Sequence, residues 1–117
     1  MDFTDTKILV TGGSRGIGRA AVEVVKAGGA RVAVNGRTAD STAAGVTAME
    51  SNGLLAEPGD VGTVADCEAA VSAAINSLGG LDVLVNSARV GHGGPMEDMT
   101  EAIWDDSLDV NLKGTFF

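Results

Sequence analysis

Short apolar runs alternate along this chain with longer stretches in which apolar residues recur every three or four positions. The short runs are typical of strands buried on both faces, and the longer stretches are typical of amphipathic helices. The pattern predicts strands at 7–11, 31–35, 54–57 and 81–86, and helices at 16–27, 40–51, 63–78 and from 100 onward. Strand and helix repeated in this order predict right-handed crossovers and an α/β fold with a parallel sheet. No linker or repeat divides the chain, so residues 1–117 are expected to form one domain.

Apolar stripes identify the helix faces expected to pack on the sheet. In the second helix the stripe is Ala43, Val46 and Met49, and the interior Gly45 is expected to weaken that helix. A capping threonine, with Asp66 three residues later, is expected to start the third helix at Thr63. The stripe of the third helix contains Val64, Cys67, Val71, Ala74, Ile75 and Leu78.

Composition narrows the class of protein. The 117 residues are 44% apolar, with three Phe, one Trp and no Tyr, so the core must consist mainly of aliphatic side chains. A net charge of −8 argues against binding to nucleic acid or to an anionic membrane surface. A single Cys excludes a disulfide framework, and no apolar run approaches the ~20 residues of a membrane span. Without a secretory signal, the expected location is the cytoplasm.

A glycine-rich turn joins the first strand to the first helix. Gly12 can take a tight turn, Gly16 can let the backbone approach a phosphate, and Gly18 can let the helix pack closely on the sheet. A helix N-terminus directly after such a turn favours anions. The loop therefore predicts a nucleotide phosphate site that also includes Ser14, Arg15 and Ile17. The alternative is a turn that only packs a helix onto a strand.

Two arginines bear on which dinucleotide would bind. Folds of this kind often carry an acid about 20 residues after the glycines, where it binds the adenosine ribose. Here no acid lies between Glu23 and Asp40, whereas Arg37 follows the second strand and Arg15 lies within the loop. Two arginines at the ribose would favour a 2′-phosphate, and therefore NADP over NAD. The alternative is that both are solvated loop arginines.

Three segments together resemble the short-chain dehydrogenase/reductase family. The spacing Gly12-x-x-x-Gly16-x-Gly18 resembles the family's cofactor loop. Residues 86–89, Asn-Ser-Ala-Arg, resemble its Asn-Asn-Ala-Gly segment, and residues 109–117 resemble its helix that contains a characteristic Asn. The resemblance covers essentially the whole chain but only the first half of the family's fold. It implies a Rossmann-like, doubly wound parallel sheet truncated after about four strands. The activity it implies is NADP-dependent hydride transfer with an alcohol or ketone substrate.

The resemblance also implies roles for individual residues. Asp60, followed by Val61, would meet the adenine, although a turn or capping role is an equal alternative. Asn86 and Ala88 would line the cofactor, and Asn111 would support the catalytic proton relay rather than point at water as an ordinary helical Asn. Arg89 replaces the family's glycine, and it could either contact the pyrophosphate or obstruct it.

The family's catalytic Ser and Tyr-x-x-x-Lys are not found in these residues, so this chain alone is expected to be inactive. The strand at 81–86 would form an exposed edge, and Phe116 and Phe117 would be exposed too, which predicts association into a homo-oligomer. A non-catalytic NADP-binding module and a protein–protein element that completes a sheet are the alternatives. His92 has no partners at metal-ligand spacing, Cys67 is expected in the core, and Trp104 is either packing or an oligomer contact.

Overall fold

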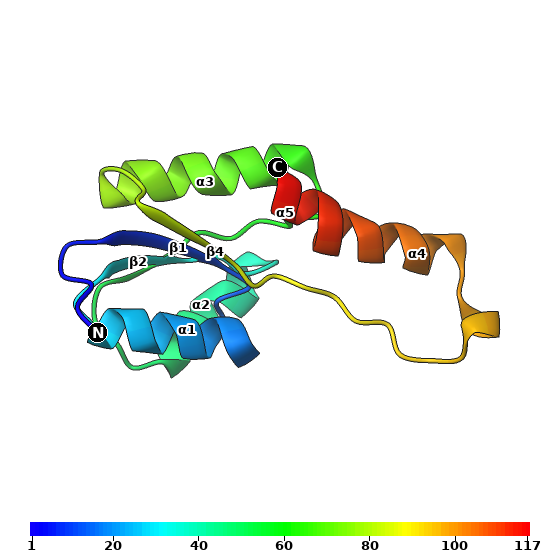
Figure 1. Cartoon of the computed structure of the whole chain (residues 1–117), viewed down its shortest axis with the longest axis horizontal. Helices are drawn as coiled ribbons and strands as arrows, with labels where there is room; N and C mark the ends of the chain where they lie inside the picture. Colours follow the sequence, from blue (N-terminus) through cyan, green and yellow to red (C-terminus); the bar gives the residue numbers. More distant parts are fainter.

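The computed structural model describes residues 1–117 and places four parallel strands in one sheet, with helices on both faces (Figure 1). The sheet order is β3-β2-β1-β4, and each neighbouring pair is parallel. This is the Rossmann-like, doubly wound arrangement that the alternating pattern and the resemblance predict. The strands are β1 (Lys7–Thr11), β2 (Arg31–Val34), β3 (Leu54–Ala56) and β4 (Val83–Asn86).

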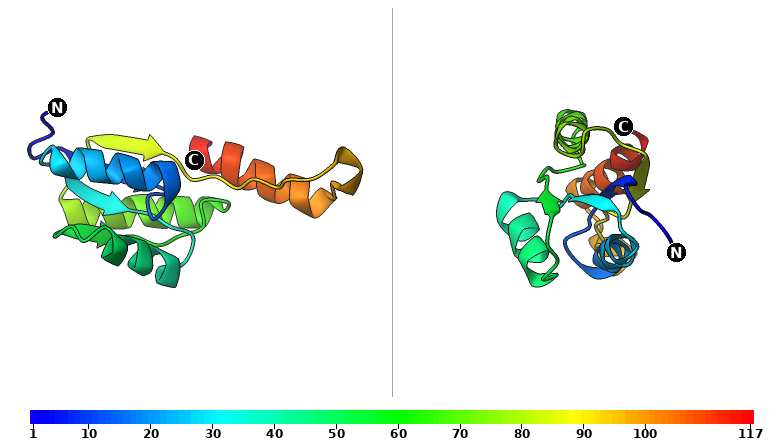
Figure 2. Two further views of the ribbon diagram at one scale, coloured as in Figure 1. Left: turned by 90° about the horizontal axis from the view of Figure 1, so that it is seen from below. Right: turned by 90° about the vertical axis from the view of Figure 1, so that its left-hand side faces the viewer.

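Two apolar layers hold the helices against the sheet, one on each face. The helices α1 (Gly16–Ala27) and α2 (Ala39–Ala48) cover the face to which Ile8 and Val10 point. The helix α3 (Val64–Leu78) covers the other face, to which Leu9 points (Figures 1 and 2). These three β1 side chains are almost completely buried, because successive residues of a central strand face opposite covered sides.

The helix and strand boundaries agree closely with the sequence pattern. β1 and α1 have the predicted limits, β2 and β3 are each one residue shorter, and β4 starts two residues later. α2 ends earlier than predicted because Glu50 adopts a left-handed conformation, with a φ of 49°. Thr38 caps α2 through a capping box with Ser41. Thr63 caps α3 as predicted, and its hydroxyl accepts a hydrogen bond from the Asp66 amide at 3.2 Å.

Two stripe predictions are wrong in one residue each. In α2 the buried residue is Thr42 rather than Ala43, and Thr42 donates its hydroxyl hydrogen bond back to the Thr38 carbonyl at 2.6 Å. In α3 the small Ala70 lies in the buried face, and Ile75 is 42% exposed. Both differences follow from the true helix phase, which a stripe of mixed small residues does not determine.

The segment after β4 projects away from the sheet. It passes through the short helix η1 (Met96–Asp98) and returns as α4 (Glu101–Leu108), the π-helical turn η2 (Asp109–Lys113) and α5 (Gly114–Phe116). Figure 1 shows this segment extending from one end of the sheet, and the molecule is 49 Å long but only 26 Å wide. β4 is an edge of this four-stranded sheet, and Leu84 on it is 44% exposed. No helix is both long and apolar enough to cross a membrane.

Candidate functional site

The carboxyl ends of the parallel strands open into one large cleft of about 800 Å³. The loops that follow all four strands contribute to its walls, and α4 contributes from the projecting segment. In open α/β sheets this is the position at which ligands bind. The predicted site residues that line the cleft are Gly12, Ser14, Arg15, Gly16, Ile17, Gly18, Arg37, Asp60, Val61 and Ala88.

The three glycines of the β1–α1 loop have the backbone geometry that their spacing predicts. Gly12 has a φ of 63°, and a Cβ there would lie 2.6 Å from the Ala88 Cα. A Cβ on Gly18 would collide with the Gly12 carbonyl, so this glycine allows α1 to approach the loop. Gly16 has a φ of 57° and no atom within 4 Å of a Cβ position, so its backbone faces open cleft. No side chain caps the N-terminus of α1.

A threonine hydroxyl fixes the loop after β1 to the loop after β4. The Thr11 hydroxyl oxygen accepts hydrogen bonds from the main-chain amides of Ser87 at 3.2 Å and Ala88 at 3.3 Å. Thr11 is only 7% exposed, so its hydroxyl lies inside the junction between the two loops. The sequence places Thr11 at the end of an apolar strand, but it gives no sign of these partners.

A buried asparagine performs the corresponding role between β2 and β3. The Asn35 side-chain amide donates to the carbonyl oxygens of Glu57 at 3.0 Å and Gly59 at 3.1 Å. The main-chain carbonyl of Asn35 accepts from the Gly13 amide at 2.9 Å. Asn35 is 1% exposed, and it therefore holds together the loops that carry the glycines and Asp60. An Asn directly after an apolar strand is the signal that could have identified it.

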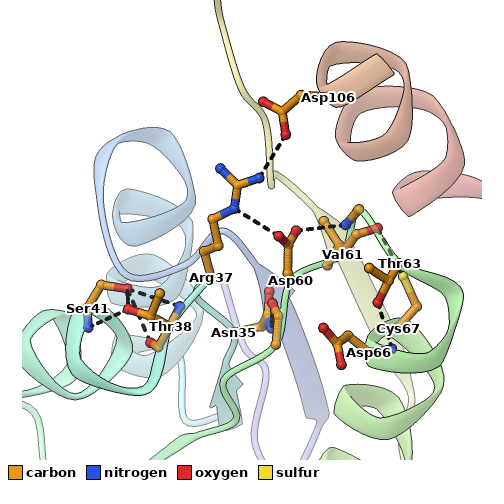
Figure 3. Close-up of polar contacts among 12 residues, drawn as sticks. Asn35, Arg37, Thr38, Ser41, Asp60, Val61, Thr63, Asp66, Cys67 and Asp106 are labelled. Atoms are coloured by element: carbon orange, nitrogen blue, oxygen red, sulfur yellow. Dashed lines mark hydrogen bonds and ion pairs between the residues drawn. The ribbon is translucent and has the colours of Figure 1, made fainter. Parts of the chain in front are cut away.

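Arg37 lies at the centre of a cluster of charged side chains. Its Nε lies 3.0 Å from a carboxylate oxygen of Asp60, and its Nη2 lies 2.8 Å from Asp106 Oδ1 (Figure 3). The second oxygen of Asp106 lies 2.8 Å from His92 Nε2. Asp60 raises the pKa of Arg37 through its hydrogen bond, and Asp106 adds to this shift. The hydrogen bond from His92, followed by that from Arg37, lowers the pKa of Asp106.

This cluster changes the sequence-based interpretation of the arginines. Arg37 is half exposed in its loop, but it is not a free partner of Arg15, because two carboxylates already bind it. Arg15 and Arg89 line the same cleft without any ion pair. Asp106 lies on α4, and no motif in the sequence singles it out.

Two predicted residues lie outside the cleft wall. Asn86, at the end of β4, lines a small and mostly apolar cavity of about 30 Å³. Asn111 lies in η2, where its side chain accepts from the Val90 amide at 2.9 Å and donates to the Val90 carbonyl at 3.0 Å. Asn111 therefore anchors the loop after β4, and its role in a proton relay stays a prediction.

Cys67 and the acidic residues form no further reactive site. Cys67 is buried beside Val61 and Val110 as predicted, and its thiol donates to the Val61 carbonyl at 3.2 Å. Burial raises the pKa of this thiol, so it is held in its protonated form. No three His, Cys, Asp or Glu side chains are placed to hold a metal ion.

Comparison with known proteins identifies the family. The family model for short chain dehydrogenase matches residues 6–117. The chain belongs to the short-chain dehydrogenase family. The monensin polyketide synthase putative ketoacyl reductase of Streptomyces virginiae is 40% identical to it over 115 residues, which are 97% of this chain and 44% of that protein. The gluconate 5-dehydrogenase of Gluconobacter oxydans is 35% identical over 98% of this chain and 46% of its own length.

Solved structures of similar proteins have the same fold. A short-chain dehydrogenase from Burkholderia cenocepacia in complex with NADP is 34% identical, with a TM-score of 0.87 over 99% of this chain and 49% of that one. A blue fluorescent protein from a metagenomic library, in complex with NADPH, has the same identity and TM-score over the same shares of the two chains. The chain thus spans about half the length of the relatives it matches.

Proposed function

We propose that this chain is the nucleotide-binding half of a short-chain dehydrogenase and that it binds NADP(H) in the cleft at the ends of β1–β4. The observation that carries the proposal is the glycine loop, in which Gly16 leaves open space beside the uncapped start of α1. A pyrophosphate there would meet main-chain amides at the positive end of a helix dipole. The NADP and NADPH complexes of two similar proteins support the choice of a nicotinamide dinucleotide.

Preference for NADP over NAD rests on the arginines. Arg37 leaves β2 at the position where the ribose of a dinucleotide would lie, and Arg15 lines the same cleft. A guanidinium provides the planar pair of donors that a phosphate monoester accepts. Asp60, Val61 and Ala88 would form the remaining wall around the adenosine.

Hydride transfer to or from an alcohol or ketone is proposed for a longer polypeptide that contains this chain. The 117 residues contain no Tyr, and their three lysines occur outside any Tyr-x-x-x-Lys pattern. The cofactor supplies the hydride chemistry, while these residues would bind and orient it. Asn111, which anchors the loop after β4, would act here as a positioning residue.

The test is a titration of the chain with NADPH and NADH, followed by cofactor fluorescence. Gly16→Val places a side chain in open cleft, and Gly79→Val is its matched control, because Gly79 also has a positive φ of 76° and empty space around its Cβ position. Gly16→Val should weaken NADPH binding by at least roughly tenfold, which corresponds to about 1.4 kcal/mol, while Gly79→Val should not change it. Equal affinity in the two variants would contradict the proposed position of the cofactor.

The exposed edge of the sheet favours self-association as a second property. Leu84 on β4 is 44% exposed, and Phe116 and Phe117 are 81% and 60% exposed. An open apolar edge offers unpaired main-chain groups to another strand. We therefore propose that the isolated chain associates with copies of itself, as the sequence predicts.

A further inference from the structure

The charged cluster around Arg37 joins four separate segments of the chain. Arg37 follows β2, Asp60 follows β3, His92 lies in the loop after β4, and Asp106 lies on α4. Arg37 uses its Nε for Asp60 and its Nη2 for Asp106. Two of the directions in which its guanidinium could bind a phosphate are thus already occupied by carboxylates.

The two carboxylates are held differently. Asp60 Oδ1 accepts a hydrogen bond from the Gly62 amide at 2.9 Å, so its own loop keeps it in place. Asp106 has no main-chain partner for its side chain, and its oxygens contact only Arg37 and His92. The Asp106 side chain is 33% exposed and that of Arg37 is 50% exposed, so this contact can exchange without disturbing the core. Asp106 is therefore the partner that an incoming anion can displace.

The net charge of this cluster disfavours binding of a phosphate. One guanidinium faces two carboxylates, which leaves one surplus negative charge when His92 is neutral. A phosphate monoester carries further negative charge, so it must either lie beside Asp106 or replace it on Arg37. An unphosphorylated ribose hydroxyl meets no such repulsion and can donate a hydrogen bond to a carboxylate.

We propose that Asp106 determines nucleotide specificity by competing with the 2′-phosphate for Arg37. The carboxylate lowers the affinity for a 2′-phosphorylated nucleotide relative to the unphosphorylated one, and binding of the phosphate separates α4 from Arg37. This inference rests on the proposed nucleotide site. Losing an exposed ion pair such as Arg37–Asp106 lowers the affinity of the competing phosphate by roughly fivefold.

The test compares adenosine 2′,5′-bisphosphate with adenosine 5′-monophosphate by isothermal titration of the whole chain at low salt. Asp106→Asn removes the charge and keeps the shape of the side chain. Asp105→Asn is the matched control, because Asp105 is an exposed neighbour on α4 without an ion pair. Asp106→Asn should tighten bisphosphate binding by roughly fivefold and change monophosphate binding less than twofold. Asp105→Asn should change neither ligand by more than twofold.

The same substitution made in a chain that also carries Arg37→Met shows whether the effect requires Arg37. The Arg37→Met chain has no guanidinium for which Asp106 and the phosphate could compete. Adding Asp106→Asn to this chain should therefore no longer tighten binding of the bisphosphate. A gain that persists there would overturn competition for Arg37, and so would an equal shift of both ligands in the Arg37 chain. If neither nucleotide binds the parent chain, the proposed function fails and this inference fails with it. If both bind and their ratio is unchanged by Asp106→Asn, only this inference fails.

Discussion

Gly45→Ala separates two opposing physical effects in α2. Gly45 lies inside this helix, where replacing glycine by alanine ordinarily stabilises a protein by about 0.5–1 kcal/mol. The structure predicts the opposite sign, because a Cβ on Gly45 would lie 2.5 Å from the Ser14 carbonyl oxygen and 2.6 Å from the Ser14 Cβ. Ser14 belongs to the glycine loop, so this close contact joins α2 to the cleft.

The expected loss of stability follows from the atoms that a Cβ on Gly45 would contact. The contact atoms belong largely to the main chain of Ser14, so no flexible side chain can move aside, and the helix or the loop must shift. Overpacking of this kind costs about 2 kcal/mol, within a usual range of 1–3 kcal/mol. After subtracting a propensity gain of about 1 kcal/mol, Gly45→Ala should destabilise the chain by about 1 kcal/mol. The displaced loop should also bind NADPH more weakly.

Urea unfolding followed by circular dichroism measures this difference. With a denaturant dependence of about 2 kcal/mol per molar, the midpoint should fall by about 0.5 M. Thr47→Ala is the control, because Thr47 is an exposed position in α2 with no side-chain hydrogen bond, and it should gain a few tenths of a kcal/mol. A Gly45→Ala chain as stable as the parent would refute the argument from close packing.

Three further outcomes are expected. Thr11→Val removes the acceptor of two amides and should cost about 1–3 kcal/mol by urea unfolding, whereas Thr11→Ser should cost less; equal losses would contradict the role of the hydroxyl. The pKa of Asp106 lies below its ordinary 3.8 in the folded chain, so its stabilising effect is present above that pH and is lost as the pH falls through the lowered value. The stability difference between the parent and Asp106→Asn should therefore become smaller as the pH falls through that lowered value, and a difference that widens there would be inconsistent with the pair. Leu84→Lys on the β4 edge should reduce self-association in sedimentation velocity, and a parent chain that is already monomeric would count against the exposed edge as an association site.

The fold could be predicted because a buried segment must consist of apolar residues. A strand covered on both faces must be apolar throughout, and β1 is both the clearest run and a fully buried strand. The buried face of a helix is harder to predict from sequence where its residues are small, so the pattern does not identify Thr42 and Ala70 as buried. The weakening assigned to Gly45 came from helix propensity alone, which contains no information on its contact with Ser14.

Within the site, contacts between residues close in sequence could be predicted better than contacts between distant residues. The roles of Gly16 and Gly18 depend on backbone angles and on contacts within one turn, so their spacing alone predicts them, whereas Gly12 also packs against Ala88 from the loop after β4. The partners of Arg37 are distant in sequence: Asp60 is 23 residues away and Asp106 is 69 residues away. No local pattern can report contacts that only the folded sheet and α4 create.

No acidic residue follows β2 in the sequence where one is expected, but two carboxylates from other segments lie beside Arg37 in the folded chain. The absence of any Asp or Glu between Glu23 and Asp40 favours NADP only if nothing else brings a carboxylate to the ribose. Asp60 and Asp106 bring two to Arg37, from the loop after β3 and from α4. In the proposed nucleotide site, the choice between NAD and NADP depends on whether Arg37 gives up Asp106, which is an equilibrium between two anions at one guanidinium rather than a property of one sequence position.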